Sequence, residues 1–298
     1  MAVSESFKAR RASLWADVAV LGVALVWGAS YPVAKGALAH MPVLLLIFYR
    51  FALTALVMTS VAYRDLRRAP RRELSAGALL GAILCAIFIA ETRGVAMTTA
   101  TNTALIISLC TIFTPFLEFG LQRKLPPVGV MAGAVVAVIG VMVLSGGMGA
   151  LGAGDMLVLC AAGLRAVMVV STKRLMEGSR LSSAALTAVQ AAMVAGLTGA
   201  LLLGQSGFAG LLVRADVAAW GAVAFLSLFC TVGAFYVQNA AVRRTSPTRV
   251  SFLMGTEPLF GFALAWALLS EPVTPTALLG ATLIVSGTFV GLWVEREH

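Results

Sequence analysis

Residues 17–37 have the sequence DVAVLGVALVWGASYPVAKGA, an almost unbroken run of apolar and small side chains. A helix needs about 20 mostly apolar residues to cross the hydrocarbon core of a bilayer. Basic residues precede the run, as they do in a signal peptide. Because the run continues through Pro32 and Lys35 and similar runs follow, we interpret it as an uncleaved first span.

Further stretches of the same kind follow along the chain, at 43–63, 75–94, 98–118, 126–146, 155–172, 182–204, 217–237, 248–269 and 274–294. The connectors between them are short, so no soluble domain is inserted. The sequence therefore predicts an all-α membrane protein with ten transmembrane helices.

The composition excludes an ordinary soluble domain. Of the 298 residues, 60% are hydrophobic and 12% are charged, whereas a soluble domain has about 25% charged residues. The net charge of +9 would suit a nucleic-acid partner, but the basic residues occur in short connectors between apolar runs. That distribution is typical of membrane proteins, so we expect a lipid bilayer around the chain and no nucleic acid.

The positions of Lys and Arg predict the orientation. Outer connectors hold Arg93 and Arg214, whereas alternate connectors are rich in basic residues: Arg64, Arg67, Arg68, Arg71, Arg72, Arg123, Lys124, Lys173, Arg174, Arg180, Arg243, Arg244 and Arg249. Basic connectors stay in the cytoplasm. We therefore expect both termini in the cytoplasm and a bacterial inner (plasma) membrane as the location.

The two halves of the chain, 1–150 and 151–298, resemble each other. Matching positions are Lys35 with Lys173, Pro115 with Pro258, Gly133 with Gly280, and Gly140 with Gly287. Each half has five predicted spans, an odd number, so the second half must be inverted relative to the first. Inverted repeats are common in secondary transporters, whose substrate site lies near mid-membrane where the repeats meet.

Several motifs resemble a known family. They are ALVWGASYPVAK at 24–35, Tyr49-Arg50-Phe51, FY at 235–236, Glu257-Pro258 and LSEP at 269–272. The chain resembles EamA-type proteins of the drug/metabolite transporter superfamily, and among them the YddG-type exporters of aromatic amino acids. The resemblance implies two inverted five-helix repeats, a central cavity and export of small metabolites. The first half departs from the pattern, since Arg123-Lys124 stands where the second half has the acidic Glu271.

Two charged residues are the leading candidates for a substrate site. Arg165 and Glu257 fall inside predicted spans, where a charge costs about 2.5–3.5 kcal/mol unless it has a partner or a water-filled cavity. Arg165 is expected either to bind a substrate carboxylate or to pair with Glu91 or Glu257. The carboxylate of Glu257 is expected to bind a substrate amine, accept a coupling proton or cap a kink.

Other side chains in the spans are candidate substrate contacts, because polar groups and aromatic rings can line a cavity for a zwitterionic aromatic solute. The candidates are Trp27, Tyr31, Tyr49, Glu91, Asn102, Tyr236 and Asn239. Aromatic residues in membrane helices also serve as packing or interfacial residues. The alternatives remain open at this point.

Two prolines are candidate hinges. A proline inside a helix lacks an N–H group, so Pro115 frees the carbonyl of Thr111 and Pro258 frees that of Met254. We expect bends at both prolines that serve alternating access.

Missing motifs narrow the function. The sequence has no G-x-x-x-x-G-K-[ST] motif, so no ATPase subunit or activity is implied. Its only histidines, His40 and His298, lie in a connector and at the end of the chain, so no metal or other cofactor is expected. The prediction is a secondary transporter, not an enzyme, that exports aromatic amino acids. The alternatives are another cargo (another amino acid, a drug or a nucleotide sugar), an intramembrane enzyme, or a membrane scaffold.

Overall fold

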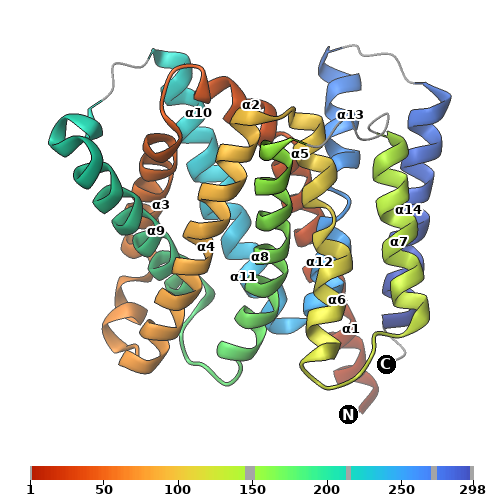
Figure 1. The fold of residues 1–298 in the computed structure, drawn as a ribbon. Helices are drawn as coiled ribbons and strands as arrows, with labels where there is room; N and C mark the ends of the chain where they lie inside the picture. Colours follow the sequence, from red (N-terminus) through yellow and green to blue (C-terminus); the bar gives the residue numbers. More distant parts are fainter. Residues whose placement is uncertain (1, 145–151, 213–215, 270–273, 296–298) are drawn as a thin grey trace.

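The computed structural model describes residues 2–144, 152–212, 216–269 and 274–295. These residues form a bundle of helices with short connections, and both ends of the chain lie at the bottom of the bundle in Figure 1. The helices of the first half are α1 (Ala2–Gly28), α2 (Ser30–Leu38), α3 (Val43–Arg68), α4 (Arg71–Met97), α5 (Ala100–Ile107), α6 (Cys110–Gly120) and α7 (Val128–Leu144). Those of the second half are α8 (Ala153–Leu175), α9 (Ser183–Ser206), α10 (Val217–Ser227), α11 (Ala234–Arg244), α12 (Pro247–Met254), α13 (Glu257–Leu269) and α14 (Pro275–Glu295).

Within the described residues, most of each predicted span lies in helix. By length and composition, 8 helical stretches can cross a membrane, counting α1 with α2, α5 with α6, and α10 with α11 as single stretches. The helix α7 is apolar but shorter, and α12 and α13 are separated by an interruption. The predicted boundary between the halves, at residue 150, lies outside the described residues.

Several helices are interrupted inside the bundle. A six-residue π-helical segment, Leu228–Gly233, joins α10 to α11, and a two-residue turn separates α5 from α6 at Ser108–Leu109. A second turn separates α12 from α13 at Gly255–Thr256. Such interruptions leave backbone groups without their regular helical partners, which membrane proteins tolerate where the backbone is buried in protein or lines a cavity.

The interruption at Gly255–Thr256 lies next to a proline, whereas the one at Ser108–Leu109 does not, and the hinge role of both prolines stays a prediction. Pro258 follows the interruption directly and lies in the first turn of α13, where its missing N–H is tolerated. Pro115 lies within α6, more than a turn beyond the interruption at Ser108–Leu109. The first break therefore forms ahead of the proline that was expected to cause it.

The helices α7 and α14 pack closely because glycines face each other across their contact. A Cβ atom on Gly133 would lie 2.6 Å from the Gly291 nitrogen and 2.7 Å from the Gly287 oxygen. A Cβ atom on Gly140 would lie 2.6 Å from the Ile284 nitrogen and 2.8 Å from the Gly280 oxygen. Small residues at such positions let helix backbones approach in membranes. The glycines that matched in the sequence therefore meet in space.

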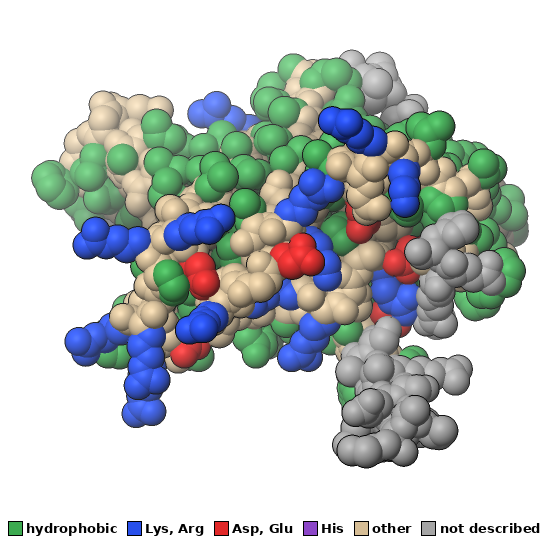
Figure 2. Space-filling view, turned by 90° about the horizontal axis from the view of Figure 1, so that it is seen from below, with side chains coloured by type: hydrophobic (Ala, Val, Ile, Leu, Met, Phe, Trp, Pro, Cys, Tyr) green, Lys and Arg blue, Asp and Glu red, His purple; other side chains and the backbone are tan. Residues whose placement is uncertain are grey.

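The end of the bundle that carries the chain termini is rich in basic side chains (Figure 2). The last turns of α3, α8 and α11 supply many of them: Arg67, Arg68, Lys173, Arg174, Arg243 and Arg244. Cations at helix C-termini also interact favourably with the helix dipole.

A substitution at the glycine contact tests the packing. We expect Gly140→Ala to destabilise the protein by about 1–3 kcal/mol, because the methyl group meets backbone atoms of α14 that cannot rotate away. Thermal unfolding of the purified protein in detergent measures the effect. The matched control is Gly196→Ala in α9, where a Cβ atom has nothing within 4 Å. Equal melting temperatures for the two variants would contradict the close contact.

Candidate functional site

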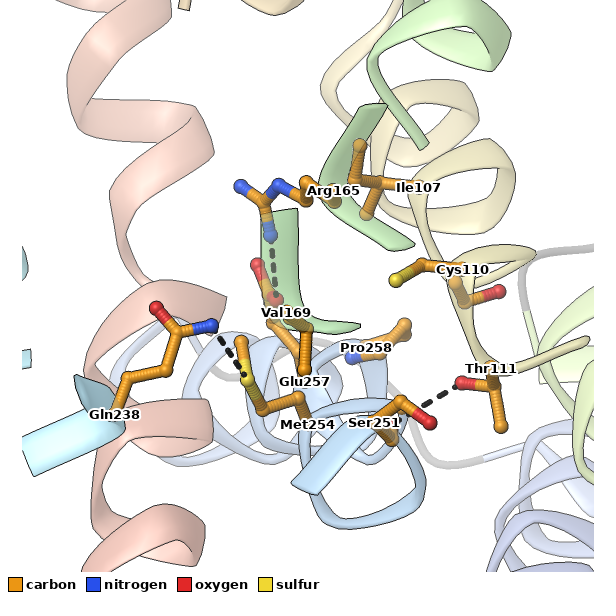
Figure 3. Close-up of a pocket in the computed structure, with 12 residues that line it drawn as sticks. Ile107, Cys110, Thr111, Arg165, Val169, Gln238, Ser251, Met254, Glu257 and Pro258 are labelled. Carbon is orange, nitrogen blue, oxygen red and sulfur yellow. Dashed lines mark hydrogen bonds and ion pairs between the residues drawn. The ribbon is translucent and has the colours of Figure 1, made fainter. Parts of the chain in front are cut away.

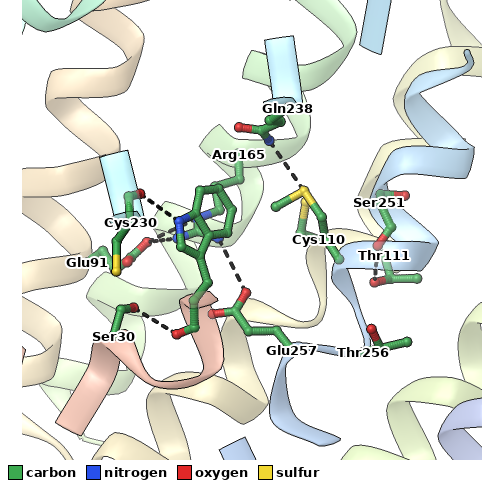
Figure 4. A network of polar contacts seen from close by, with 12 residues as sticks. Ser30, Glu91, Cys110, Thr111, Arg165, Cys230, Gln238, Ser251, Thr256 and Glu257 are labelled. Atoms are coloured by element: carbon green, nitrogen blue, oxygen red, sulfur yellow. Dashed lines mark hydrogen bonds and ion pairs between the residues drawn. The ribbon is translucent and has the colours of Figure 1, made fainter. Parts of the chain in front are cut away.

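The centre of the bundle holds a buried cluster of three charged side chains from three helices (Figure 4). Arg165 of α8 donates to Glu91 of α4, with 3.1 Å from Nε and 2.8 Å from Nη2 to the same carboxylate oxygen Oε2. Its Nη1 lies 3.9 Å from Oε2 of Glu257 at the start of α13. The sequence left open whether Arg165 binds a substrate carboxylate or pairs with Glu91 or Glu257. In the structure it pairs with both acids.

Trp27 connects α1 to this cluster. Its ring lies 4.9 Å from the guanidinium carbon of Arg165, within the range of a cation–π contact. Its indole nitrogen donates to the carbonyl of Cys230 at 2.8 Å. That carbonyl lies in the π-helical segment, whose irregular backbone leaves groups for contacts with other helices.

Gly28, which follows Trp27, explains how α1 comes so near to the start of α13. A Cβ atom on Gly28 would lie 2.8 Å from both the Glu257 carbonyl oxygen and the Gly261 nitrogen. The backbone of α1 thus touches the start of α13, and Trp27 and Tyr31 are brought next to the charged cluster. A larger residue at position 28 would separate them.

Glu257 is buried, with 3% of its surface exposed, and one of its oxygens is unpaired. Oε1 makes no hydrogen bond of regular geometry within the described part of the chain. The hydroxyl of the buried Tyr31, which also lacks one, lies close enough to the same carboxylate to interact with it. Glu257 also begins α13, where the helix dipole stabilises a negative charge. An unpaired buried carboxylate oxygen is costly, so this atom is a candidate for contact with a ligand.

A small pocket adjoins Glu257, between the interrupted helices of the two halves (Figure 3). Its walls come from α5, α6, α8, α11, α12 and α13, and its polar lining residues are Ser108, Thr111, Arg165, Gln238, Ser251 and Glu257. The cavity volume is about 30 Å³. In this conformation it can hold a water molecule or a group of similar size, and a whole metabolite would require the walls to move apart.

Arg50 forms a second buried cationic centre beside the first. Its Nε donates to the Thr231 hydroxyl at 2.7 Å, and its guanidinium carbon lies 4.7 Å from the ring centroid of Phe88. Its Nη2 also donates to the Cys230 carbonyl at 3.4 Å. Trp27 and Arg50 therefore share one carbonyl of the π-helical segment, which ties α1 and α3 to it.

The structure places the other candidate contacts away from these charged side chains. The Tyr49 hydroxyl donates to the Leu211 carbonyl, and its ring packs edge-on against Trp220. Asn239 donates to Thr187 and Gln190, and 45% of Tyr236 is exposed on the outside of the protein chain. None of these contacts links them to Arg165 or Glu257.

Each end of the bundle has a polar network that links the two halves. Near the termini, Arg249 of α12 donates to both oxygens of Asp17 of α1, at 2.7 and 2.5 Å, and its Nη1 lies 3.6 Å from Glu295. At the opposite end, Asp155 of α8 accepts from the Thr98 hydroxyl at 2.6 Å and from Asn102 at 3.4 Å.

Sequence reasoning missed the network near the termini. Asp17 lies at the edge of the first predicted span and Arg249 at the edge of the ninth, so neither carried the signal of a charge buried in lipid. Their pairing joins residues that are 232 positions apart, and a single sequence offers no measure of such proximity. Asn102, by contrast, was a candidate, and the structure places it in the network at the opposite end.

A comparison with protein families decides the classification. The model of the EamA-like transporter family matches the chain twice, at residues 14–146 and 152–293. The chain belongs to the EamA-like transporter family. It is therefore an integral membrane transporter, and it is not an enzyme.

Individual relatives of this EamA protein are also described as transporters or efflux pumps. A "probable amino-acid metabolite efflux pump" of Salmonella typhimurium (strain LT2) is 29% identical, over 92% of this chain and 93% of the relative. A protein with the same description from Escherichia coli (strain K12) is 26% identical, over 94% and 95% of the two chains. An "uncharacterized transporter" of Archaeoglobus fulgidus is 25% identical, over 93% and 85%.

A solved structure also has the same fold. It superimposes with a TM-score of 0.77 at 18% identity and covers 95% of this chain and 98% of its own. At this identity the likeness shows the fold of this EamA protein and nothing about its cargo.

The charged cluster predicts non-additive stability changes. Arg165→Met leaves two buried carboxylates without their cation, so we expect it to lower the free energy of unfolding by about 3–5 kcal/mol. Adding Glu91→Gln removes one of the stranded charges, and the double variant should be more stable than Arg165→Met alone. Thermal or denaturant unfolding in one detergent compares them. The pairing would be contradicted if the free energy of unfolding of the double variant fell by the sum of the decreases measured for Arg165→Met and Glu91→Gln alone.

Proposed function

We propose that this EamA-type protein exports aromatic amino acids by alternating access, through a site beside Arg165 and Glu257. The observation that carries the proposal is the buried charged cluster next to a pocket between interrupted helices of the two halves. Charges at membrane depth are costly and mark substrate or ion pathways in transporters. The substrate contacts assigned to this centre are Arg165, Glu91, Glu257, Trp27 and Tyr31.

Two inverted five-helix repeats, 1–150 and 151–298, account for ten crossings. The family model matches each half separately. The packing partners agree with a twofold relation: α3 packs on α9, α6 on α12 and α7 on α14, and the contact of α4 with α8 has its counterpart in that of α1 with α11. Lys35 donates to the Val95 carbonyl at one end of the bundle, and its match Lys173 donates to the Arg243 carbonyl at the other. These pairs support the repeat.

Alternating access is supported by the polar networks at the two ends. The network near the termini joins α12 to α1, and the opposite network joins α5 to α8. In a twofold arrangement these are the same contact seen from opposite sides. Opening one network while the other stays closed would expose the pocket to one side at a time. Only the network near the termini contains an ion pair of opposite charges, so within the described residues it is the stronger closure.

The interruptions supply places for movement. Pro258 at the start of α13 remains a candidate hinge, because the turn at Gly255–Thr256 lies directly before it. Pro115 would act as a hinge only together with the separate break at Ser108–Leu109. The basic end of the bundle is assigned to the cytoplasm, which places both termini there and the protein in the inner membrane of a bacterium.

The cargo assignment rests on the relatives and on the chemistry of the site. Two relatives are described as amino-acid metabolite efflux pumps. The centre of this protein offers the buried carboxylate of Glu257 near the rings of Trp27 and Tyr31, which suits a solute that carries an amine and an aromatic side chain.

Transport by the purified protein tests the cargo. Proteoliposomes should take up labelled phenylalanine and tryptophan saturably and faster than alanine, and Arg165→Ala should lower the rate by at least about tenfold, since it collapses the charged centre. Uptake no faster than in empty liposomes would remove the aromatic assignment and leave an exporter of another metabolite.

Cys110, which lines the pocket, can report on opening at the end near the termini. We expect Asp17→Asn to raise the rate at which an impermeant thiol reagent labels Cys110 from that side by about tenfold, because the variant loses the ion pair with Arg249. Mass spectrometry of the peptide containing Cys110 measures the rate. The matched control is Asp65→Asn, which changes an exposed acid near the end of α3. Equal labelling rates in the two variants would refute the closure.

A further inference from the structure

We propose that the pocket beside Glu257 is a subsite for the ammonium group of the substrate, and that Arg165 does not bind the substrate carboxylate. The inference rests on the proposed function, because it concerns the same site, and it reverses the role that the sequence suggested first for Arg165. Solutes that carry an amine should bind whether or not they also carry a carboxylate.

One side of the Arg165 guanidinium, formed by Nε and Nη2, is already bound to a carboxylate of the protein. Its Nε and Nη2 both donate to Glu91, its Nη1 is directed at Glu257, and the ring of Trp27 lies 4.9 Å from its central carbon. A carboxylate binds arginine best through two parallel donors. The other pair of parallel donors, on Nη1 and Nη2, lies beside Glu257, since Nη1 is 3.9 Å from Oε2 of that residue. A substrate carboxylate bound there would therefore lie next to a second buried anion.

Apart from Arg165 and Gln238, the polar groups of the pocket walls offer acceptors in place of donors. Each of the three lining hydroxyls donates to a backbone carbonyl: Ser108 to Leu105 at 2.6 Å, Thr111 to Ser251 at 3.2 Å, and Ser251 to Thr248 at 2.8 Å. With their hydrogens used in this way, the hydroxyls present only lone pairs to a guest. The missing N–H of Pro258 leaves the Met254 carbonyl without its regular helical donor.

Glu257 completes the set of acceptors. Its Oε1 is buried and makes no hydrogen bond of regular geometry, and among the described residues Glu257 supplies the only carboxylate of the pocket lining. An ammonium group has three donors and no acceptor, so it matches this lining. A carboxylate or phosphate would face lone pairs and a second negative charge.

The local charge also favours a cation. When ionised, Arg165, Glu91 and Glu257 carry one positive and two negative charges, so one negative charge is left over within the cluster. Arg50 adds a positive charge nearby, but its contacts are with the Thr231 hydroxyl and the Phe88 ring, and among the described residues it forms no ion pair with Glu257. An ammonium group beside Glu257 would neutralise the remaining charge where the surroundings are apolar and the interaction is strong.

The size of the pocket is consistent with a subsite and not with a whole solute. A cavity of about 30 Å³ has room for one water molecule or one ammonium group. The remainder of a substrate would occupy space that forms only when the repeats move. The structure therefore preserves the part of the site that recognises charge.

Binding of matched guests to the purified protein in nanodiscs tests the inference. Tryptophan carries both charges, tryptamine lacks the carboxylate, 3-indolepropionate lacks the amine, and 3-methylindole lacks both. We expect tryptamine to bind within about tenfold of tryptophan and 3-indolepropionate to bind at least about tenfold more weakly. Isothermal calorimetry or thermal stabilisation gives the dissociation constants.

Variants assign the preference to a residue. Glu257→Gln should weaken the binding of tryptamine by at least about tenfold and leave the affinity for 3-methylindole unchanged. Unchanged binding of 3-methylindole also shows that the variant is folded. Glu177→Gln, which changes an exposed acid beyond α8, should leave all four guests unchanged. Strong binding of 3-indolepropionate that Arg165→Met abolishes, or amine binding that Glu257→Gln leaves intact, would overturn the proposal.

The same comparison with isobutylamine and isobutyrate separates this inference from the cargo assignment. Suppose that no indole guest binds, but isobutylamine binds more tightly than isobutyrate and Glu257→Gln removes this preference. The aromatic cargo is then wrong, and the ammonium subsite stands. If neither amine binds, the ammonium subsite is overturned, whatever the protein transports.

Discussion

The rest of the structure depends on keeping one guanidinium stable in the middle of a membrane. Arg165 requires Glu91 from α4, Glu257 from α13 and the ring of Trp27 from α1, so these three helices must converge on α8. A charge at this depth costs about 2.5–3.5 kcal/mol without partners. Because the partners come from both halves of the chain, the same contacts that stabilise the charge also join the halves around the pocket.

Small residues make that convergence possible. Gly28 brings α1 against the start of α13, and a Cβ atom on Gly94 of α4 would lie 2.9 Å from the Gly154 carbonyl of α8. At these places a single methyl group would force the helices apart and lengthen the contacts of Arg165. The π-helical segment and the turns before α6 and α13 then provide carbonyls and room at the same depth, which continuous helices would not.

Much of the fold could be predicted from the sequence, because the need for apolar runs of sufficient length is local. The helical membrane fold was predicted in this way, and the family was predicted from local motifs. The matching glycines were recognised as a repeat, but their contact between α7 and α14 was not predicted. Five of the candidate residues, Arg165, Glu91, Glu257, Trp27 and Tyr31, lie together in the structure, since a charge or ring in a span needs a partner. Their binding of a substrate stays a prediction. The contacts of Tyr49 and Asn239 and the pairing of Asp17 with Arg249 depend on which helix faces which, and the break ahead of Pro115 depends on packing and not on proline chemistry.

The most direct test of the account is an experimental structure of the protein in lipid with tryptophan bound, at a resolution that shows side chains. The account predicts that Arg165 keeps its two hydrogen bonds to Glu91 and that the amine of tryptophan lies within hydrogen-bond distance of Glu257. A tryptophan carboxylate seated on Arg165, with Glu91 displaced and Glu257 away from the amine, would contradict it.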